Sequence, residues 1–206
     1  MKIGFIGLGN VGGKLSGSLL RNGHDLTVHD LDDDLVSGFV ARGARAGENP
    51  AQLMRDCEAV ITCLPSPAAS AAVMEQMLPE VVPGKIWLEM STTDAGEIKR
   101  LGEMVGARGG AAVDCPVSGG CHRADTGNIA IFAGCGRDTF ERVLPLLTTM
   151  GRRVLHTGDL GSASVLKALI LDCRSVSLKR SMCDSMSRRI FSRFVCIVES
   201  ILMSAL

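Results

Sequence analysis

Three glycines near the start of the chain have the spacing of a phosphate-binding turn. Gly7, Gly9 and Gly12 form a G-x-G-x-x-G pattern that follows the apolar run 2–6 and opens a helix-like segment. The first glycine would permit a tight turn, the second would let the backbone approach a pyrophosphate, and the third would let the helix pack closely on the strand. A helix N-terminus also favours an anion. Rather than a purely structural glycine turn, we predict a dinucleotide site formed by Gly7, Leu8, Gly9, Asn10, Val11 and Gly12.

An acidic residue ends the second strand-like segment. Asp30 lies 18 residues after Gly12. A carboxylate at this point accepts hydrogen bonds from the hydroxyls of an adenosine ribose and repels a 2′-phosphate. Residues 31–34 add three acidic side chains and no basic one, so the pattern favours NAD over NADP. The alternative role for Asp30 is the N-cap of the next helix, and the two roles are compatible.

Two further strand ends carry residues suited to the same crevice. Leu64 and Pro65 follow one apolar strand and would wall the adenosine side. Ser91 and Thr92 follow another and would reach the nicotinamide ribose or the substrate. The alternatives are a proline turn and a Ser/Thr helix cap, which need no ligand.

A third strand end, in the segment DCPVSGG, offers a place for a carboxylate. Ser118 supplies a hydroxyl, and Gly119 and Gly120 leave backbone N–H groups exposed. Such a turn can cradle an anion. The alternative is a glycine turn without a ligand.

The elements that would position these residues alternate regularly from residue 1 to about residue 156. Short apolar, β-branched runs alternate with helix-like patterns, which indicates βαβ units and a mostly parallel, doubly wound α/β sheet. Ligands bind beyond the carboxyl ends of the strands in such sheets. The candidate residues above all follow strands, so we expect them at one edge of the sheet.

Composition excludes several other classes of protein. The formal net charge is zero and aromatic residues make up 3% of the chain, which argues against a nucleic-acid partner. The eight cysteines form no C-x-x-C pair, so we expect reduced thiols and no metal site. The chain starts on a strand-like run without a leader, which favours the cytoplasm, or the mitochondrial matrix if a leader is missing from this sequence. No apolar run is long enough to span a bilayer comfortably.

Together the segments resemble the β-hydroxyacid dehydrogenase family, which includes 3-hydroxyisobutyrate dehydrogenase, tartronate semialdehyde reductase and 6-phosphogluconate dehydrogenase. The resemblance implies a Rossmann-type fold, NAD at the glycine loop and Asp30, a substrate at Ser118, Gly119 and Gly120, and a catalytic role for Lys167. The matching segments occur in family order over residues 1–169: GFIGLGNVGG, VHD, ITCLPSP, EMSTT, DCPVSGG, TGNIAIFAGC and GSASVLK.

Lys167 has a chemical reason for that role. Oxidation of an alcohol by hydride transfer needs a base for the hydroxyl proton. A lysine desolvated by apolar neighbours has its ammonium form disfavoured and can act as that base. The apolar neighbours in the sequence are Val165, Leu166, Ala168 and Leu169. Taken by itself, the segment favours the alternative, a surface lysine on an amphipathic helix, and the family resemblance is what favours the catalytic role.

The chain departs from the family near its end. The asparagine that the family places four residues after the lysine is Leu171 here, and residues 172–206 do not resemble the family's all-helical domain. None of the 24 glycines follows Gly161, and residues 172–206 hold six Lys/Arg against three Asp/Glu. We therefore expect two parts, a nucleotide-binding domain over 1–160 and a remnant of the interdomain helix with an atypical, truncated or aberrant helical tail over 161–206.

The tail has apolar residues at helical spacing, and we expect it to self-associate. Folding back on the domain and contact with a membrane surface are the alternatives. The apolar residues in question are Ile190, Phe194, Ile197, Val198, Ile201 and Leu202. For the whole chain the sequence predicts an NAD-dependent oxidation of a short 3-hydroxy carboxylate, such as 3-hydroxyisobutyrate, to its semialdehyde. The alternative is a catalytically silent NAD(P)-binding module or interaction subunit.

Overall fold

The computed structural model of the chain describes the backbone of residues 1–176 and the side chains of residues 1–171. The predicted helical tail, with its apolar residues at helical spacing between Ile190 and Leu202 and its expected self-association, lies outside the described residues. The predicted nucleotide-binding domain, residues 1–160, lies entirely within the described residues.

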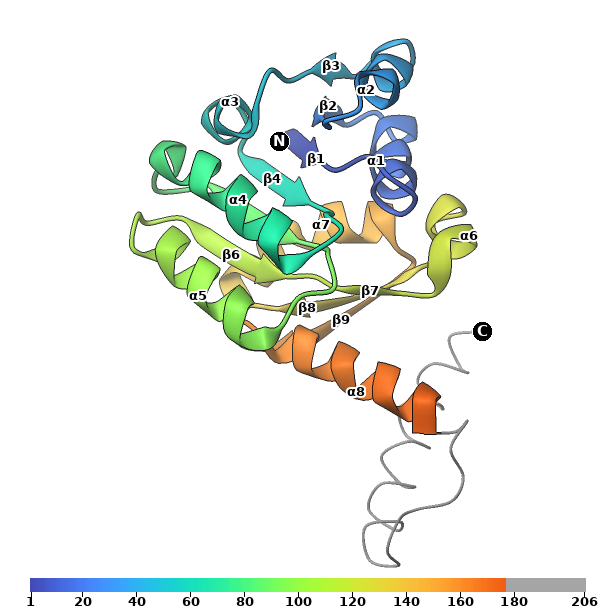
Figure 1. Cartoon of the computed structure of the whole chain (residues 1–206), viewed down its shortest axis with the longest axis vertical. Helices are drawn as coiled ribbons and strands as arrows, with labels where there is room; N and C mark the ends of the chain where they lie inside the picture. The colour runs from blue at the N-terminus through green and yellow to red at the C-terminus, as the bar shows by residue number, and fades with distance from the viewer. Residues whose placement is uncertain (177–206) are drawn as a thin grey trace, which may run out of the picture.

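Within the described residues, nine strands form one sheet (Figure 1). Their order is β3-β2-β1-β4-β5-β6-β8-β7, and β9 pairs with β8. Pairing is parallel from β3 through to β6 and between β8 and β9, whereas β8 runs antiparallel to β6 and β7. The predicted doubly wound, mostly parallel sheet is therefore confirmed. The strands are β1 Lys2–Ile6, β2 Asp25–His29, β3 Arg45–Ala46, β4 Ala59–Thr62, β5 Ile86–Glu89, β6 Ala111–Asp114, β7 Val117–Ser118, β8 Ala130–Gly134 and β9 Arg153–Gly158.

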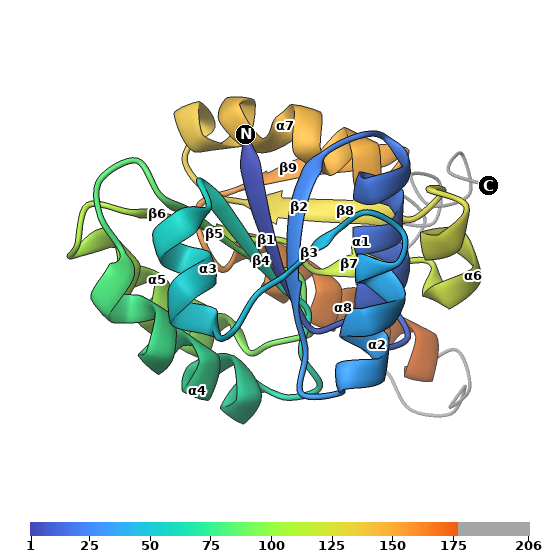
Figure 2. The same cartoon turned by 90° about the horizontal axis from the view of Figure 1, so that it is seen from above.

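Helices cover both faces of the sheet, with α4 and α5 on one face and α1 and α7 on the other (Figures 1 and 2). The last described helix, α8, packs against β8, β9 and β6. The helices are α1 Gly12–Arg21, α2 Asp33–Val40, α3 Pro50–Asp56, α4 Pro67–Met77, the 3₁₀ turn η1 Leu78–Glu80, α5 Ala95–Gly106, α6 Gly120–Asp125, α7 Arg137–Met150 and α8 Ser162–Val176.

Each face of the sheet has its own hydrophobic core. Burial of one large apolar side chain contributes about 1.5–3 kcal/mol, so these two cores supply the main stabilisation of the domain. The core beneath α1, α2 and α7 includes Leu15, Leu19, Phe39, Val143 and Leu147. The core beneath α3, α4 and α5 includes Leu53, Met74, Trp87, Ile98 and Leu101.

Polar residues fix where the helices begin. Asp32, Asn49, Ser66 and Asp94 cap α2, α3, α4 and α5 by accepting hydrogen bonds from the first backbone N–H groups. The N-cap of α2 is thus Asp32, and the alternative that Asp30 would serve as this cap is wrong. The reason is that the chain makes one further turn after β2, in which Asp30 accepts a hydrogen bond from the N–H of Asp32.

The segment over 111–120, expected as a single strand running into a turn, is divided. Residues 111–114 form β6, and residues 117–118 form β7, which pairs with β8 in the opposite direction. Pro116 lies between them and cannot donate to a strand ladder. The short elements β3, α3 and α6 were not predicted.

None of the helices described between residues 1 and 176 is long and apolar enough to cross a membrane. The five cysteines among residues 1–171, whose side chains the structure describes, carry free thiols. Three of them, Cys57, Cys115 and Cys135, are buried.

Candidate functional site

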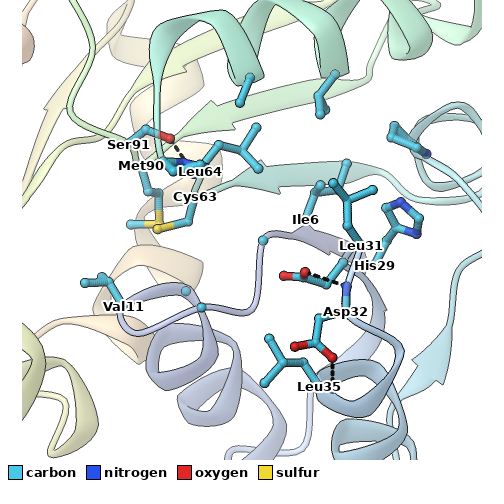
Figure 3. Close-up of a pocket in the computed structure, with 18 of the residues that line it drawn as sticks. Ile6, Val11, His29, Leu31, Asp32, Leu35, Cys63, Leu64, Met90 and Ser91 are labelled. Carbon is cyan, nitrogen blue, oxygen red and sulfur yellow. Dashed lines mark hydrogen bonds between the residues drawn. The ribbon is translucent and has the colours of Figure 1, made fainter.

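A cavity of about 990 Å³ opens at the carboxyl ends of β1, β2, β4 and β5. Figure 3 shows it extending from Leu31, Asp32 and Leu35 at one end to Met90 and Ser91 at the other. The chain builds the sheet outward from β1 in both directions, with β2 on one side and β4 on the other. Nucleotides bind at such a reversal of strand order in doubly wound sheets. Its lining includes most of the predicted cofactor residues, namely Gly7, Gly9, Asn10, Val11, Gly12, Asp30, Leu64, Pro65, Ser91 and Thr92.

Two of the loop glycines are required by the fold itself. Gly7 has a φ of +95°, and a Cβ added there would collide with the carbonyl oxygen of Cys63. A Cβ added at Gly12 would collide with the carbonyl oxygen of Gly7. Gly9 differs, because a Cβ there would meet no described atom within 4 Å. The space in front of Gly9 belongs to the cavity, so the fold does not itself require a glycine here and leaves room for a ligand to approach the backbone.

The N-terminus of α1 faces the same space without a side-chain cap. Val11 occupies the N-cap position and makes no side-chain cap hydrogen bond. The N–H groups of Gly13 and Lys14 donate to the carbonyl oxygens of Gly9 and Val11, so it is chiefly the dipole of the helix that favours an anion at this end. The uncapped helix and the open space at Gly9 fit the pyrophosphate of a dinucleotide.

Asp30 connects β2 to the glycine loop. Its Oδ2 accepts a 2.5 Å hydrogen bond from the backbone N–H of Leu8, and its Oδ1 accepts a 3.0 Å bond from the N–H of Asp32. Leu8 is buried and, alone among the predicted loop residues, does not line the cavity. The carboxylate oxygens have further lone pairs available, so Asp30 can also accept a bond from a ribose hydroxyl.

The loops that follow β4 and β5 are joined at the other end of the cavity. The Oγ of Ser91 accepts a 2.7 Å hydrogen bond from the backbone N–H of Leu64 (Figure 3). Cys63 lies beside this bond, where burial raises the pKa of its thiol to about 12. The thiol therefore stays neutral near pH 7 and is a poor nucleophile.

The residues predicted to bind substrate lie just outside the cavity lining. Ser118 is buried at the end of β7, and Gly119 and Gly120 follow with φ values of +133° and +80°. Both glycines adopt backbone conformations that other residues rarely adopt. Val117, the residue before Ser118, lines the cavity and so links the two regions.

The side chain of Lys167, on α8, contacts Val117. Its Nζ donates a 2.8 Å hydrogen bond to the carbonyl oxygen of Val117. The expected apolar enclosure is not formed by the described residues, since Val165 and Leu169 expose 50% and 39% of their surface. The helix presents these two residues to solvent, and Leu166 instead packs against the core.

Sequence reasoning missed the contact that holds α8 in place. Asp114, at the end of β6, accepts 2.7 Å hydrogen bonds from both the backbone N–H and the hydroxyl of Ser164. Burial raises the pKa of Asp114, and the bonds from Ser164 lower it to a lesser extent. The two residues are 50 positions apart, and no local pattern in the sequence marks them as a pair.

Comparison with known proteins identifies the family. A family model described as the NAD binding domain of 6-phosphogluconate dehydrogenase matches residues 2–158. The chain belongs to this family. The predicted resemblance to β-hydroxyacid dehydrogenases and the prediction of a nicotinamide cofactor are thereby confirmed.

Several relatives share this domain. The probable mitochondrial 3-hydroxyisobutyrate dehydrogenase of Dictyostelium discoideum is 30% identical over 87% of this chain and 58% of its own length. The human cytokine-like nuclear factor N-PAC is 30% identical over 82% of this chain and 31% of its own length. Among solved structures, 3-hydroxyisobutyrate dehydrogenase of Mycobacterium tuberculosis with L-serine superposes with a TM-score of 0.80 at 25% identity, over 85% of this chain and 62% of that one. The chain therefore spans less than two thirds of each of these relatives.

Proposed function

We propose that the chain is the nucleotide-binding part of an NAD-dependent dehydrogenase that oxidises a short 3-hydroxy carboxylate, of the 3-hydroxyisobutyrate type, to its semialdehyde. The oxidation removes a hydride from carbon and a proton from the hydroxyl. Bound NAD would supply the hydride acceptor. The protein residues would hold the cofactor and the substrate and accept the proton.

Lys167 is the residue proposed to accept that proton. The observation that carries the proposal is its hydrogen bond to Val117, because Val117 belongs both to the cavity wall and to the strand that precedes the glycine turn. A substrate hydroxyl between Lys167 and the nicotinamide end of the cavity would replace this carbonyl as the partner of Nζ. Ser118, Gly119 and Gly120 would hold the substrate carboxylate with a hydroxyl and backbone N–H groups.

The substrate class is supported by the relatives. Two of them carry the name 3-hydroxyisobutyrate dehydrogenase, and one of these was solved with L-serine. 3-Hydroxyisobutyrate and serine both carry a hydroxyl two carbons away from a carboxylate. A site with a proton acceptor at one end and an anion cradle at the other is suited to that arrangement.

NAD is proposed over NADP because of Asp30. The carboxylate is fixed at the cavity by Leu8 and Asp32, and Asp32 also lines the cavity. Two acidic groups beside the ribose would repel a 2′-phosphate. Isothermal titration should show tighter binding of NAD than of NADP, and an equal or reversed preference would reject this choice.

The test of the proposed reaction is cofactor reduction over a panel of short hydroxy acids. The panel should include 3-hydroxyisobutyrate, L-serine, and 2-hydroxy acids of the same size as matched controls. We expect NADH to form with the 3-hydroxy acids and not with the 2-hydroxy acids. Turnover restricted to 2-hydroxy acids would reject the proposed substrate class.

A second candidate is a nucleotide-binding module without catalysis. It is favoured by the solvent exposure of Val165 and Leu169 beside Lys167, since water would compete for the site. It is also consistent with the relative named as a nuclear factor. NAD binding without turnover of any hydroxy acid would select this candidate.

A further inference from the structure

A carboxyl group that the proposed reaction does not use lies next to the residues that line the cavity. Glu89, the last residue of β5, exposes only 1% of its surface. Its Oε1 accepts a 2.8 Å hydrogen bond from the backbone N–H of Ser91. Its Oε2 has no hydrogen-bond partner among the described residues. A buried carboxylate in this situation is costly, whereas a neutral carboxylic acid is not charged and has a proton to donate.

The hydroxyls around Glu89 are consistent with a proton on Oε2. The Oγ of Ser70, on α4, is buried and also has no partner among the described residues. The hydroxyl of Thr62 already accepts a 2.8 Å bond from the indole N–H of Trp87. Ser70 acts on the pKa of Glu89, but no hydrogen bond joins its Oγ to Oε2 in this structure. A proton on Oε2 would provide the donor for such a bond after movement of either side chain.

The titratable groups nearest to Glu89 supply no positive charge. Cys63 follows β4, and Cys115 follows β6. Asp114 is the register partner of Glu89 on β6. Burial is the largest cause of the raised pKa of both thiols. Burial likewise raises the pKa of Glu89 itself, against smaller opposing effects of Ser91, Ser70 and Thr62.

Glu89 is connected to the cavity wall through two successive hydrogen bonds. The first joins its Oε1 to the N–H of Ser91, and the second joins the Oγ of Ser91 to the N–H of Leu64. Ser91 and Leu64 both line the cavity. The connection therefore runs from a buried side chain through the loop after β5 to the loop after β4.

We propose that Glu89 is a positioning residue of the dinucleotide cavity, retained as a neutral carboxylic acid that orients Ser91 and, through Ser91, Leu64. This proposal rests on the proposed binding of NAD in the cavity. Ionisation of Glu89 would place an uncompensated charge beneath the wall and disturb both loops. The neutral form is fully populated below the ordinary pKa of 4.5, and its contribution to folding is lost as the pH rises through the raised value in the folded chain.

The decisive variant is Glu89→Gln, which is neutral at every pH. Its amide oxygen can still accept from Ser91, and its NH₂ group can donate to Ser70. We expect the Kd for NAD of this variant to lie within about twofold of the unaltered chain just above the ordinary pKa of 4.5, and to change little as the pH rises. The affinity of the unaltered chain should fall by about tenfold or more as the pH rises through the raised pKa of Glu89.

Glu97→Gln is the matched control. Glu97 pairs with Arg100 on the surface of α5, and this hydrogen-bonded pairing lowers the pKa of its carboxyl, so Glu97 does not titrate in the tested range. The control should keep the pH profile of the unaltered chain. The proposal is overturned if Glu89→Gln keeps that profile too, or if it weakens NAD binding tenfold at the low end of the pH range.

A second measurement separates this proposal from the cofactor proposal. The thermal unfolding midpoint of Glu89→Gln, relative to the unaltered chain, should rise with pH, because only the unaltered chain has a carboxyl to ionise. If the unaltered chain binds no NAD, the cofactor proposal fails and the positioning role fails with it. The unfolding midpoints of Glu89→Gln and the unaltered chain then still decide whether Glu89 is neutral. If the difference between the two midpoints does not change with pH, Glu89 is not a neutral carboxylic acid.

Discussion

The carboxylate of Asp30 holds the glycine loop by its backbone, through a 2.5 Å hydrogen bond from the N–H of Leu8 to Oδ2. Leu8 is a core residue with 2% of its surface exposed. The bond therefore joins a residue at the edge of the cavity to one that cannot move without disturbing the core beneath α1. Asp30 thus has a structural role in the loop in addition to its proposed contact with a ribose.

Two substitutions of Asp30 should separate these roles. Asp30→Asn keeps an oxygen that can accept from Leu8 but removes the charge, so we expect it to bind NAD almost as the unaltered chain does and to discriminate less against NADP. Asp30→Ala removes both the acceptor and the charge. A lost hydrogen bond to a charged group costs about 1.5–3 kcal/mol, so NAD affinity should fall by about 10–100-fold, as measured by isothermal titration. Equal effects of the two variants would contradict the structural role.

The glycines of the loop provide a matched pair of substitutions. A Cβ at Gly9 meets no described atom, whereas a Cβ at Gly12 collides with the carbonyl oxygen of Gly7. Gly9→Ala should therefore keep the unfolding temperature of the chain and weaken NAD binding. Gly12→Ala should lower the unfolding temperature even without a ligand. Thermal unfolding with and without NAD measures both, and Gly9→Ala with undiminished NAD affinity would show that no ligand approaches this backbone.

The sequence was sufficient to predict the main sheet and most of its helices. Strands buried on both faces appear as continuous apolar runs, and residues 59–61 and 86–88 are apolar runs in which every residue is buried. The seven-residue helix α3 was missed because it spans only two turns and shows no clear period. Its N-cap Asn49 followed by Pro50 was the available signal.

The parts of the site that were not predicted depend on contacts between distant segments. The bonds from Glu89 to Ser91 and from Ser91 to Leu64 join two loops, and only the first has partners close in the sequence. Asp114 and Ser164 belong to elements far apart in the chain. The exposure of Val165 and Leu169 beside Lys167 likewise depends on which face of α8 packs against the sheet. A single sequence predicts such elements but not which side chains from different elements meet.

The hydrogen bonds between Asp114 and Ser164 should anchor α8. Removal of the hydroxyl in Ser164→Ala leaves the backbone bond in place and should lower the free energy of unfolding by about 1–3 kcal/mol, since a buried acceptor loses a partner. Turnover of a hydroxy acid should fall more than NAD affinity does, because α8 carries Lys167. Ser37→Ala, on the exposed surface of α2, is the control and should change neither quantity. Unchanged stability of Ser164→Ala would contradict the anchoring role.

The pH dependence of stability offers a separate check on Asp114. Its pKa in the folded chain is raised above the ordinary value of 3.8, chiefly by burial. The folded state is therefore favoured by the protonated form, and this contribution is complete below 3.8 and is lost as the pH rises through the raised value. Asp114→Asn lacks this contribution. The difference in unfolding midpoint between the unaltered chain and Asp114→Asn should therefore shrink as the pH rises from about 4 to about 7, and a growing difference would show that the pKa is lowered instead.

The role of Lys167 can be tested with a variant that has no titratable group. Lys167→Met keeps an unbranched side chain but cannot accept a proton, so the rate constant kcat for oxidation of a 3-hydroxy acid should fall by about 10²–10⁴-fold, which is the usual contribution of a general base. The Kd for NAD should remain within about twofold, because Lys167 does not line the cavity. Lys99→Met, on the exposed face of α5, controls for the loss of a positive charge. A variant Lys167→Met with undiminished kcat would exclude Lys167 as the base. A fall in both kcat and NAD affinity would instead indicate that the substitution disturbs β7, since Lys167 also donates to the carbonyl oxygen of Val117.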